Sequence, residues 1–162
     1  MVVWREVATT EESAQTLLGE YFRERALSFP PAQGHYRTVF PDPAQFVAPA
    51  GVFLIASLDG SESGDPDIGC GGIRSVAPSP DGDIRYEIKH LYLRPGARGQ
   101  GYGRRLLVEL EARAIAFGAR EVVLDTNVSQ AAAAHLYAAS GYREIPPYNS
   151  NANATTWFAK RL

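Results

Sequence analysis

The sequence is poor in cysteine and has no long apolar run: Cys70 is the only cysteine among 162 residues. A single cysteine cannot form an intrachain disulfide, which favours a reducing compartment. No apolar run approaches the roughly 18 residues that a membrane span requires. The first residues also lack the cationic and apolar regions of a secretory signal peptide. We therefore expect a soluble, cytoplasmic protein with no membrane partner.

An excess of charge and a metal-ligand pattern are absent as well. The sequence contains 16 Lys and Arg residues and 18 Asp and Glu residues, which gives a net charge of −2. This balance gives no general attraction to nucleic acid, so we expect no nucleic-acid partner. His35, His90 and His135 are scattered and have no partner at the spacing of a metal site. The sequence therefore predicts no metal.

What is present is ordinary globular composition, with 45% hydrophobic and 21% charged residues. The length predicts one domain, residues 1–162. Hydrophobic periodicity separates strands from helices. The predicted strands are 2–7, 51–58, 68–76, 84–93, 121–128, 142–145 and 155–162, with a turn at 59–67 between two of them. The predicted helices are 10–28, 101–117 and 130–140, with a short one near 42–47. This order indicates an α/β fold with a sheet of mixed direction.

The segment Leu93–Leu107, LRPGARGQGYGRRLL, places four glycines and four arginines before a predicted helix. The first N–H groups of a helix are unpaired and attract an anion. Glycines allow close approach of a phosphate group, and arginines add charge-assisted hydrogen bonds. The segment lacks the Gly-Lys-Ser/Thr ending of a P-loop and the G-x-G-x-x-G spacing of a dinucleotide site. Two readings stay open, a phosphate site and a flexible turn with solvated arginines.

Two motifs resemble those of the GCN5-related N-acetyltransferases, the GNAT superfamily. The first is R-x-x-G-x-G, at Arg98, Gly101 and Gly103. The second is a Leu-Tyr pair in a helix that ends at Gly-Tyr, and its residues are Leu136, Tyr137, Gly141 and Tyr142. The resemblance implies a GNAT-type fold, a mixed and mostly antiparallel central sheet of six to seven strands flanked by about four helices. It also implies a single acyl-CoA N-acyltransferase domain.

The resemblance further implies acetyl-CoA as acyl donor, with no metal. Its pyrophosphate would be held by the loop and helix start, at Arg98, Gly99, Gln100, Gly101, Tyr102, Gly103 and Arg104. Gln130 stands where the family often has Asn, and it would also contact the cofactor. The pantetheine arm would bind a bulged strand at Leu91, Tyr92 and Leu93.

A bulge is also predicted from the strand itself. In IRYEIKHLYL, Arg85, Glu87 and Lys89 have the same parity as Leu91 and Leu93, so one face changes from charged to apolar midway. A β-bulge produces such a change. The alternative is an edge strand with one wet end.

Two residues are the catalytic candidates. Glu87 resembles the acidic residue that the family has before its bulge, and it would deprotonate the amine directly or through water. Tyr137 would protonate the leaving thiolate, as this tyrosine does in the family. The alternatives are a surface charge pair for Glu87 and a core tyrosine for Tyr137. The run 146–158 could form a wall of the acceptor pocket with Tyr148 and Trp157, or a surface hairpin.

The predicted function is acetyl-CoA-dependent N-acetyl transfer, directly to a primary amine of a small molecule such as an amino acid, polyamine or antibiotic. Acetylation of a protein N-terminus or lysine is one alternative. A non-catalytic acyl-CoA-binding module and an interaction module that binds no cofactor are others. We expect a monomer or a homodimer.

Overall fold

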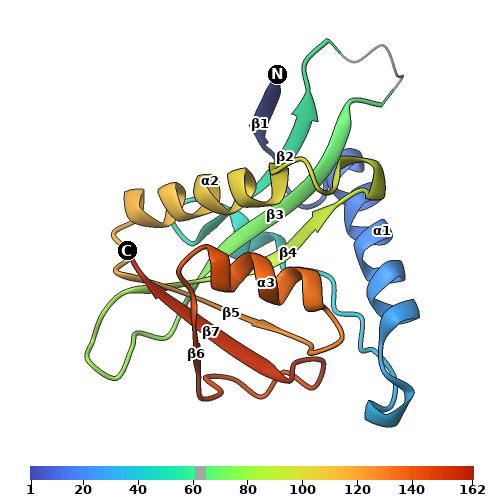
Figure 1. Ribbon diagram of the computed structural model, residues 1–162. Coiled ribbons are helices and arrows are strands. Elements are labelled where there is room, and N and C mark those ends of the chain that lie inside the picture. Colours follow the sequence, from blue (N-terminus) through green and yellow to red (C-terminus); the bar gives the residue numbers. More distant parts are fainter. Residues whose placement is uncertain (61–64) are drawn as a thin grey trace.

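The computed structural model describes residues 1–60 and 65–162 (Figure 1). Its strands are β1 (Val2–Glu6), β2 (Gly51–Leu58), β3 (Asp67–Val76), β4 (Arg85–Leu93), β5 (Glu121–Thr126), β6 (Arg143–Ile145) and β7 (Thr156–Arg161). They form one sheet in the order β1-β2-β3-β4-β5-β7-β6. β4 and β5 pair in parallel, and the other neighbouring pairs are antiparallel. The predicted mixed sheet of six to seven strands is confirmed, and part of the turn predicted at 59–67 lies outside the described residues.

The helices are α1 (Glu12–Ser28), α2 (Tyr102–Ala116) and α3 (Ala131–Ala139). The described residues thus hold three α-helices where about four were expected. The difference lies in the proline-rich segment 29–49, where only two short 3₁₀ turns form, η1 (Pro31–Gln33) and η2 (Pro43–Phe46). Proline lacks a backbone N–H and so favours short turns of this kind over a longer helix. A third 3₁₀ turn, η3 (Pro95–Ala97), precedes α2.

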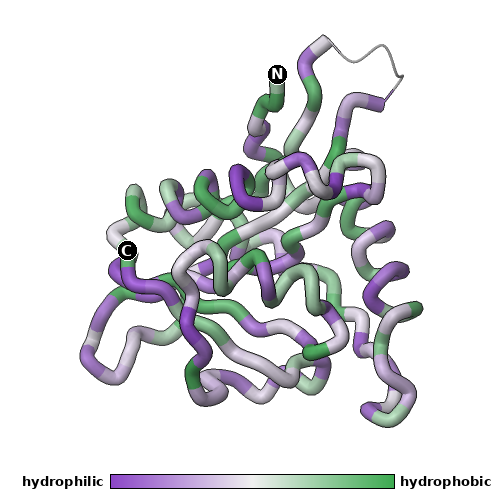
Figure 2. The backbone as a smooth tube through the Cα atoms, viewed as in Figure 1, coloured by the Kyte–Doolittle hydropathy of each residue, from purple (hydrophilic) through white to green (hydrophobic). Residues whose placement is uncertain are grey.

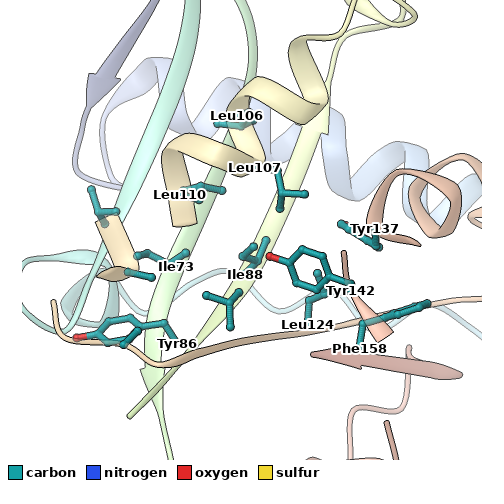
Figure 3. Close-up of a cluster of buried hydrophobic side chains, with 14 of the residues drawn as sticks. Ile73, Tyr86, Ile88, Leu106, Leu107, Leu110, Leu124, Tyr137, Tyr142 and Phe158 are labelled. Atoms are coloured by element: carbon teal, nitrogen blue, oxygen red, sulfur yellow. The ribbon is translucent and has the colours of Figure 1, made fainter. Parts of the chain in front are cut away.

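Two apolar clusters cover the two faces of the sheet, because side chains alternate along each strand. On β2, Val52 and Leu54 join the cluster under α2 and α3, while Phe53 and Ile55 join the cluster under α1 and η2. Figure 3 shows the first cluster, in which leucines of α2 lie over Ile73 of β3. In Figure 2, α1 and α2 alternate between hydrophobic and hydrophilic segments, as expected for helices with one buried side.

The run GCGG in β3 has a packing reason. A Cβ on Gly72 would lie 2.7 Å from the ring of Phe46, and one on Gly69 would collide with the carbonyl oxygen of Tyr92. Glycine therefore lets η2 and β4 approach β3 closely. Cys70, between these glycines, is fully buried, and burial raises the pKa of its thiol.

The sheet opens between β4 and β5. Their parallel pairing ends at Glu87 and Val123, after which β5 continues along β7. On the other side of β4, Gly72 pairs with Lys89 and Cys70 with Tyr92, so two residues of β4 face Gly71 alone. One of them, His90, has a φ of 57°. The predicted bulge is confirmed, and it lies beside the opening.

Candidate active site

A cavity of about 680 Å³ lies at this opening. Its walls come from several parts of the chain: the open half of β4, the start of α2, α1, α3, the loop 36–45, Arg74 of β3, the end of β5, and Asn151 and Asn153. The sequence-predicted residues that line it are Leu91, Tyr92, Leu93, Arg98, Gly99, Gly101, Gly103, Arg104, Gln130 and Tyr137. Residues more than 100 positions apart in the sequence thus share one cavity.

The start of α2 faces the cavity without a cap. Gly101, its N-cap residue, has a φ of 81°, and no side chain accepts a hydrogen bond from the first turn. The first N–H that bonds back into the helix is that of Arg105, to the carbonyl of Gly101. The preceding N–H groups of the helix therefore have no intrahelical acceptor, and such groups at a helix start can bind an anion. The space around position 101 is open, so packing does not require glycine there. The left-handed backbone does, because residues with a Cβ rarely adopt a positive φ.

The arginines of this segment divide into two roles. Arg98 forms an ion pair with Glu24 of α1 at 2.7 Å and donates from Nε to the carbonyl of Leu93 at 2.9 Å. It therefore fastens the loop to α1. Arg104 also lines the cavity, and within residues 1–60 and 65–162 its side chain has no hydrogen-bond or ion-pair partner. Of the two arginines, Arg104 is therefore the one whose guanidinium is available to bind a phosphate group.

Two predicted contacts lie elsewhere. The Gln100 side chain donates to the carbonyl of Gly96 at 2.9 Å. Tyr102 packs against the small cluster that contains Val2 and Ala56. Neither residue lines the cavity, because consecutive residues at a helix start point in different directions. Any contact of these two with a cofactor would involve their backbone.

Tyr137 is buried in the wall of the cavity, with 6% of its surface exposed. Its ring contacts those of Tyr142 and Phe158, both 5.9 Å away between centroids, and Figure 3 shows these three aromatic rings together. In the described part of the chain its hydroxyl makes no hydrogen bond. Burial raises the pKa of this phenol above its usual value. Tyr137 therefore keeps its proton at neutral pH and has a free donor at the cavity.

Glu87 is enclosed rather than exposed to the cavity. Only 1% of its surface is accessible. Arg74 donates to one carboxylate oxygen at 2.9 Å, and Tyr148 and Asn149 donate to the other at 2.6 and 3.3 Å. The cavity lining does not include Glu87. The carboxylate that was predicted as a base thus sits in a network of donors.

Asp125 is the carboxylate that the sequence analysis did not single out. It lies near the end of β5, lines the cavity and has 5% of its side chain exposed. Asn149 and Asn151 donate to it at 2.7 and 3.0 Å, and the Lys89 ammonium lies 3.8 Å away. The sequence signal for it was weak, a polar residue within an otherwise buried strand.

The run 146–158 contributes to the wall through different residues from those expected. Asn151 and Asn153 line the cavity, whereas Tyr148 and Trp157 do not. Tyr148 donates to Glu87, and the indole of Trp157 donates to Asn149 at 2.8 Å. The two aromatic residues therefore brace the polar network behind the wall.

The far end of the cavity is formed by α1 and the loop 36–45. It is aromatic and cationic, and its residues are Tyr21, Phe22, Arg25, Tyr36, Arg37 and Phe40. These segments contain no recognisable motif, so the individual residues of this end could not be predicted from the sequence.

Two expected absences can be compared with the described residues. Over residues 1–60 and 65–162, no group of three or more His, Cys, Asp or Glu side chains could hold a metal ion. No helix in that part of the chain has the length and apolarity needed to cross a bilayer.

Comparisons with known proteins identify the family of the chain. The model of the Acetyltransferase (GNAT) family matches residues 13–142. IAA acetyltransferase of Azospirillum brasilense is 34% identical over 96 residues, which cover 59% of this chain and 57% of that protein. The similarity thus spans little more than half the length of that relative.

Solved structures share the fold. A GNAT family acetyltransferase from Staphylococcus aureus has a TM-score of 0.71 at 14% identity, covering 99% of each chain. A GNAT family acetyltransferase from Elizabethkingia anophelis with acetyl-CoA bound has a TM-score of 0.65 at 16% identity, covering 99% of this chain and 98% of that one. At these identities the likeness concerns the fold alone. The family match, which spans most of the chain, shows that the protein belongs to the GNAT acetyltransferase family.

Proposed function

We propose that this protein transfers an acetyl group from acetyl-CoA directly to a primary amine of a small molecule. One observation supports this most strongly. A single cavity joins the uncapped start of α2, the open edge of β4 and the hydroxyl of Tyr137. An anion site, an extended backbone and a proton donor are what a CoA thioester requires along its length.

The cofactor-side residues fit acetyl-CoA, which would supply an activated acetyl group. The N–H groups at the start of α2 and the Arg104 guanidinium would bind its pyrophosphate. The β4 backbone from Leu91 to Leu93 would hydrogen-bond the pantetheine arm, since its pairing with β5 has already ended. Gln130, at the start of α3, would add an amide contact.

Tyr137 would act as the general acid toward the leaving thiolate. Its phenol keeps its proton, has no competing acceptor in the described residues and faces the cavity. General acid catalysis by a positioned side chain contributes about 10²–10⁴-fold to a rate.

The amine must lose its proton before or during attack. Glu87 remains the predicted base, but its oxygens already accept bonds from Arg74, Tyr148 and Asn149. Asp125 is a second candidate, because its carboxylate is part of the cavity wall. The variants Glu87→Gln and Asp125→Asn would separate the two. Loss of the carboxylate that acts as general base should remove the acidic limb of the pH profile of kcat/KM. Loss of a carboxylate with only a structural role should lower the free energy of unfolding and leave that limb in place.

The test of the function is turnover. The protein is incubated with acetyl-CoA and a panel of amines, and free CoA thiol and acetylated product are both measured. Tyr137→Phe should lower kcat by about 10²-fold or more and leave acetyl-CoA binding intact. Tyr142→Phe is the matched control, because its hydroxyl bonds Glu111 at 2.9 Å outside the cavity. Acetylation confined to peptides would favour a protein acetyltransferase, and binding without any acetylated product would contradict the enzyme.

A further inference from the structure

The acceptor end of the cavity carries charges of both signs and aromatic walls. We infer that the acceptor is an amphoteric amine: a primary amine that also bears a carboxylate and an apolar or aromatic group. This inference rests on the proposed function and narrows its substrate class.

The first observation concerns basic side chains of the cavity that form no ion pair with a carboxylate. Three basic side chains of the cavity are paired with carboxylates: Arg74 with Glu87 at 2.8 Å, Arg98 with Glu24 at 2.7 Å and Lys89 with Asp125 at 3.8 Å. Arg25 and Arg37 at the acceptor end form no ion pair within residues 1–60 and 65–162, as is also true of Arg104 at the cofactor end.

Contacts hold the guanidinium of Arg25 and the backbone of Arg37. The Arg25 guanidinium lies over the ring of Tyr21, 5.6 Å from its centroid. The backbone of Arg37 exchanges two hydrogen bonds with the Asn153 side chain, at 2.9 and 2.8 Å. This exchange fixes the loop 36–45 against the opposite wall. The Arg25 guanidinium over Tyr21 and the Arg37 side chain on this fixed loop have no carboxylate partner in the described residues, and they would bind a carboxylate of the ligand.

The second observation concerns the anion on the other side. Asp125 accepts bonds from two amide groups, Asn149 and Asn151, and its ammonium neighbour Lys89 stands 3.8 Å away. A carboxylate has room for about four hydrogen bonds, so capacity remains for a ligand ammonium group. The amide donors fix the orientation of the carboxylate toward the cavity.

Tyr137 links the two charges. Arg25, Asp125 and Tyr137 all line this one cavity. The two charges therefore face the same space as the hydroxyl that would serve the reaction. An amphoteric ligand placed across this gap would bring its amine to the reacting position.

The third observation is the aromatic lining. The ring of Phe22 lies 4.9 Å from Phe40, 6.5 Å from Tyr36 and 5.5 Å from His90, between centroids. His90 is uncharged at neutral pH, because burial, aided by Lys89 and Arg74, lowers its pKa to about 3. These walls suit an apolar or aromatic group. A polyamine would instead place extra positive charge against Arg25 and Arg37.

The experiment compares kcat/KM for phenylalanine, phenylalanine amide, phenethylamine and spermidine under saturating acetyl-CoA. The inference predicts that phenylalanine exceeds its amide and phenethylamine by tenfold or more, and that spermidine is the poorest of the four. In Arg25→Gln, the ratio of phenylalanine to phenethylamine should fall at least tenfold. Arg25→Lys should restore part of that ratio, because it keeps the charge.

Arg23→Gln is the matched control, since Arg23 is exposed on the same helix and lies outside the cavity. Its ratio should equal that of the unaltered protein, and thermal unfolding of each variant confirms that it is folded. Equal acetylation of the acid, the amide and phenethylamine would overturn the inference and leave the proposed function standing. No acetylation of any probe by a protein that binds acetyl-CoA would overturn both.

Discussion

Burial of His90 should make part of the free energy of unfolding of this protein sensitive to acid. The imidazole is buried at the bulge of β4, with 8% of its surface exposed, and its Nδ1 has no hydrogen-bond partner in the described residues. Burial is the main cause that lowers its pKa from 6.5 to about 3, and the positive charges of Lys89 and Arg74 add to it. The folded protein thus resists taking up this proton.

The sign and size follow from linkage. Because the unfolded chain binds the proton at a higher pH, stability is intact above about 6.5 and is lost progressively as pH falls toward 3. Each pH unit in that window costs about 1.4 kcal/mol. Between pH 7 and pH 5 the loss from His90 is therefore about 2 kcal/mol.

The assay is urea unfolding at pH 7 and pH 5, for the unaltered protein and for His90→Asn. Asparagine tolerates the φ of 57° at this position and does not titrate. Other ionisable groups cancel in the comparison, so the acid-induced loss should be about 2 kcal/mol smaller in the variant. The same loss in both proteins would refute the reasoning that burial of His90 sets this part of the pH dependence.

Three further predictions concern packing. Leu110 lies in the fully buried centre of the larger cluster, so Leu110→Ala should lower the free energy of unfolding by about 2–5 kcal/mol. Urea unfolding measures this loss, and a loss below about 1 kcal/mol, roughly the cost of one buried methylene, would contradict the prediction. Gly19→Ala should raise it by about 0.5–1 kcal/mol, because the position is inside α1 with open space for a methyl group. Cys70 should react with a thiol reagent only after unfolding, since burial raises its pKa and shields it; rapid labelling of the native protein would count against this.

The uncapped helix start that we propose as the cofactor side could be predicted from sequence because its geometry is local. The N–H groups at a helix start are consecutive, and the positive φ at Gly101 demands glycine, so one short stretch contains both signals. The bulge also left a local trace, the change of face between Lys89 and Leu91. The strands could be predicted from apolar runs in the sequence.

The acceptor side could not be predicted because it depends on contacts between distant segments. Glu87 and Asp125 are both acidic residues on strands, yet only Asp125 faces the cavity. What encloses Glu87 is Arg74, 13 residues away, and Tyr148, 61 residues away. The alternation of residues along a strand does not predict contacts with residues so distant in the sequence. The short helix expected near 42–47 forms at Pro43–Phe46 as a 3₁₀ turn and not as an α-helix, since prolines there restrict the chain to single turns.

The proposed function requires that the start of α2 binds acetyl-CoA. The most direct test is thermal unfolding with and without acetyl-CoA, for the unaltered protein, Gly101→Trp and Gly118→Trp. Both glycines have a positive φ, 81° and 89°, but Gly118 lies at the other end of α2, outside the cavity. The two variants therefore share the backbone strain and differ in the site.

Acetyl-CoA at about 100 times its Kd should raise the Tm of the unaltered protein by about 5–10 °C. We predict the same rise in Gly118→Trp and none in Gly101→Trp. No rise in the unaltered protein at millimolar acetyl-CoA, or an equal rise in all three proteins, would contradict the claim.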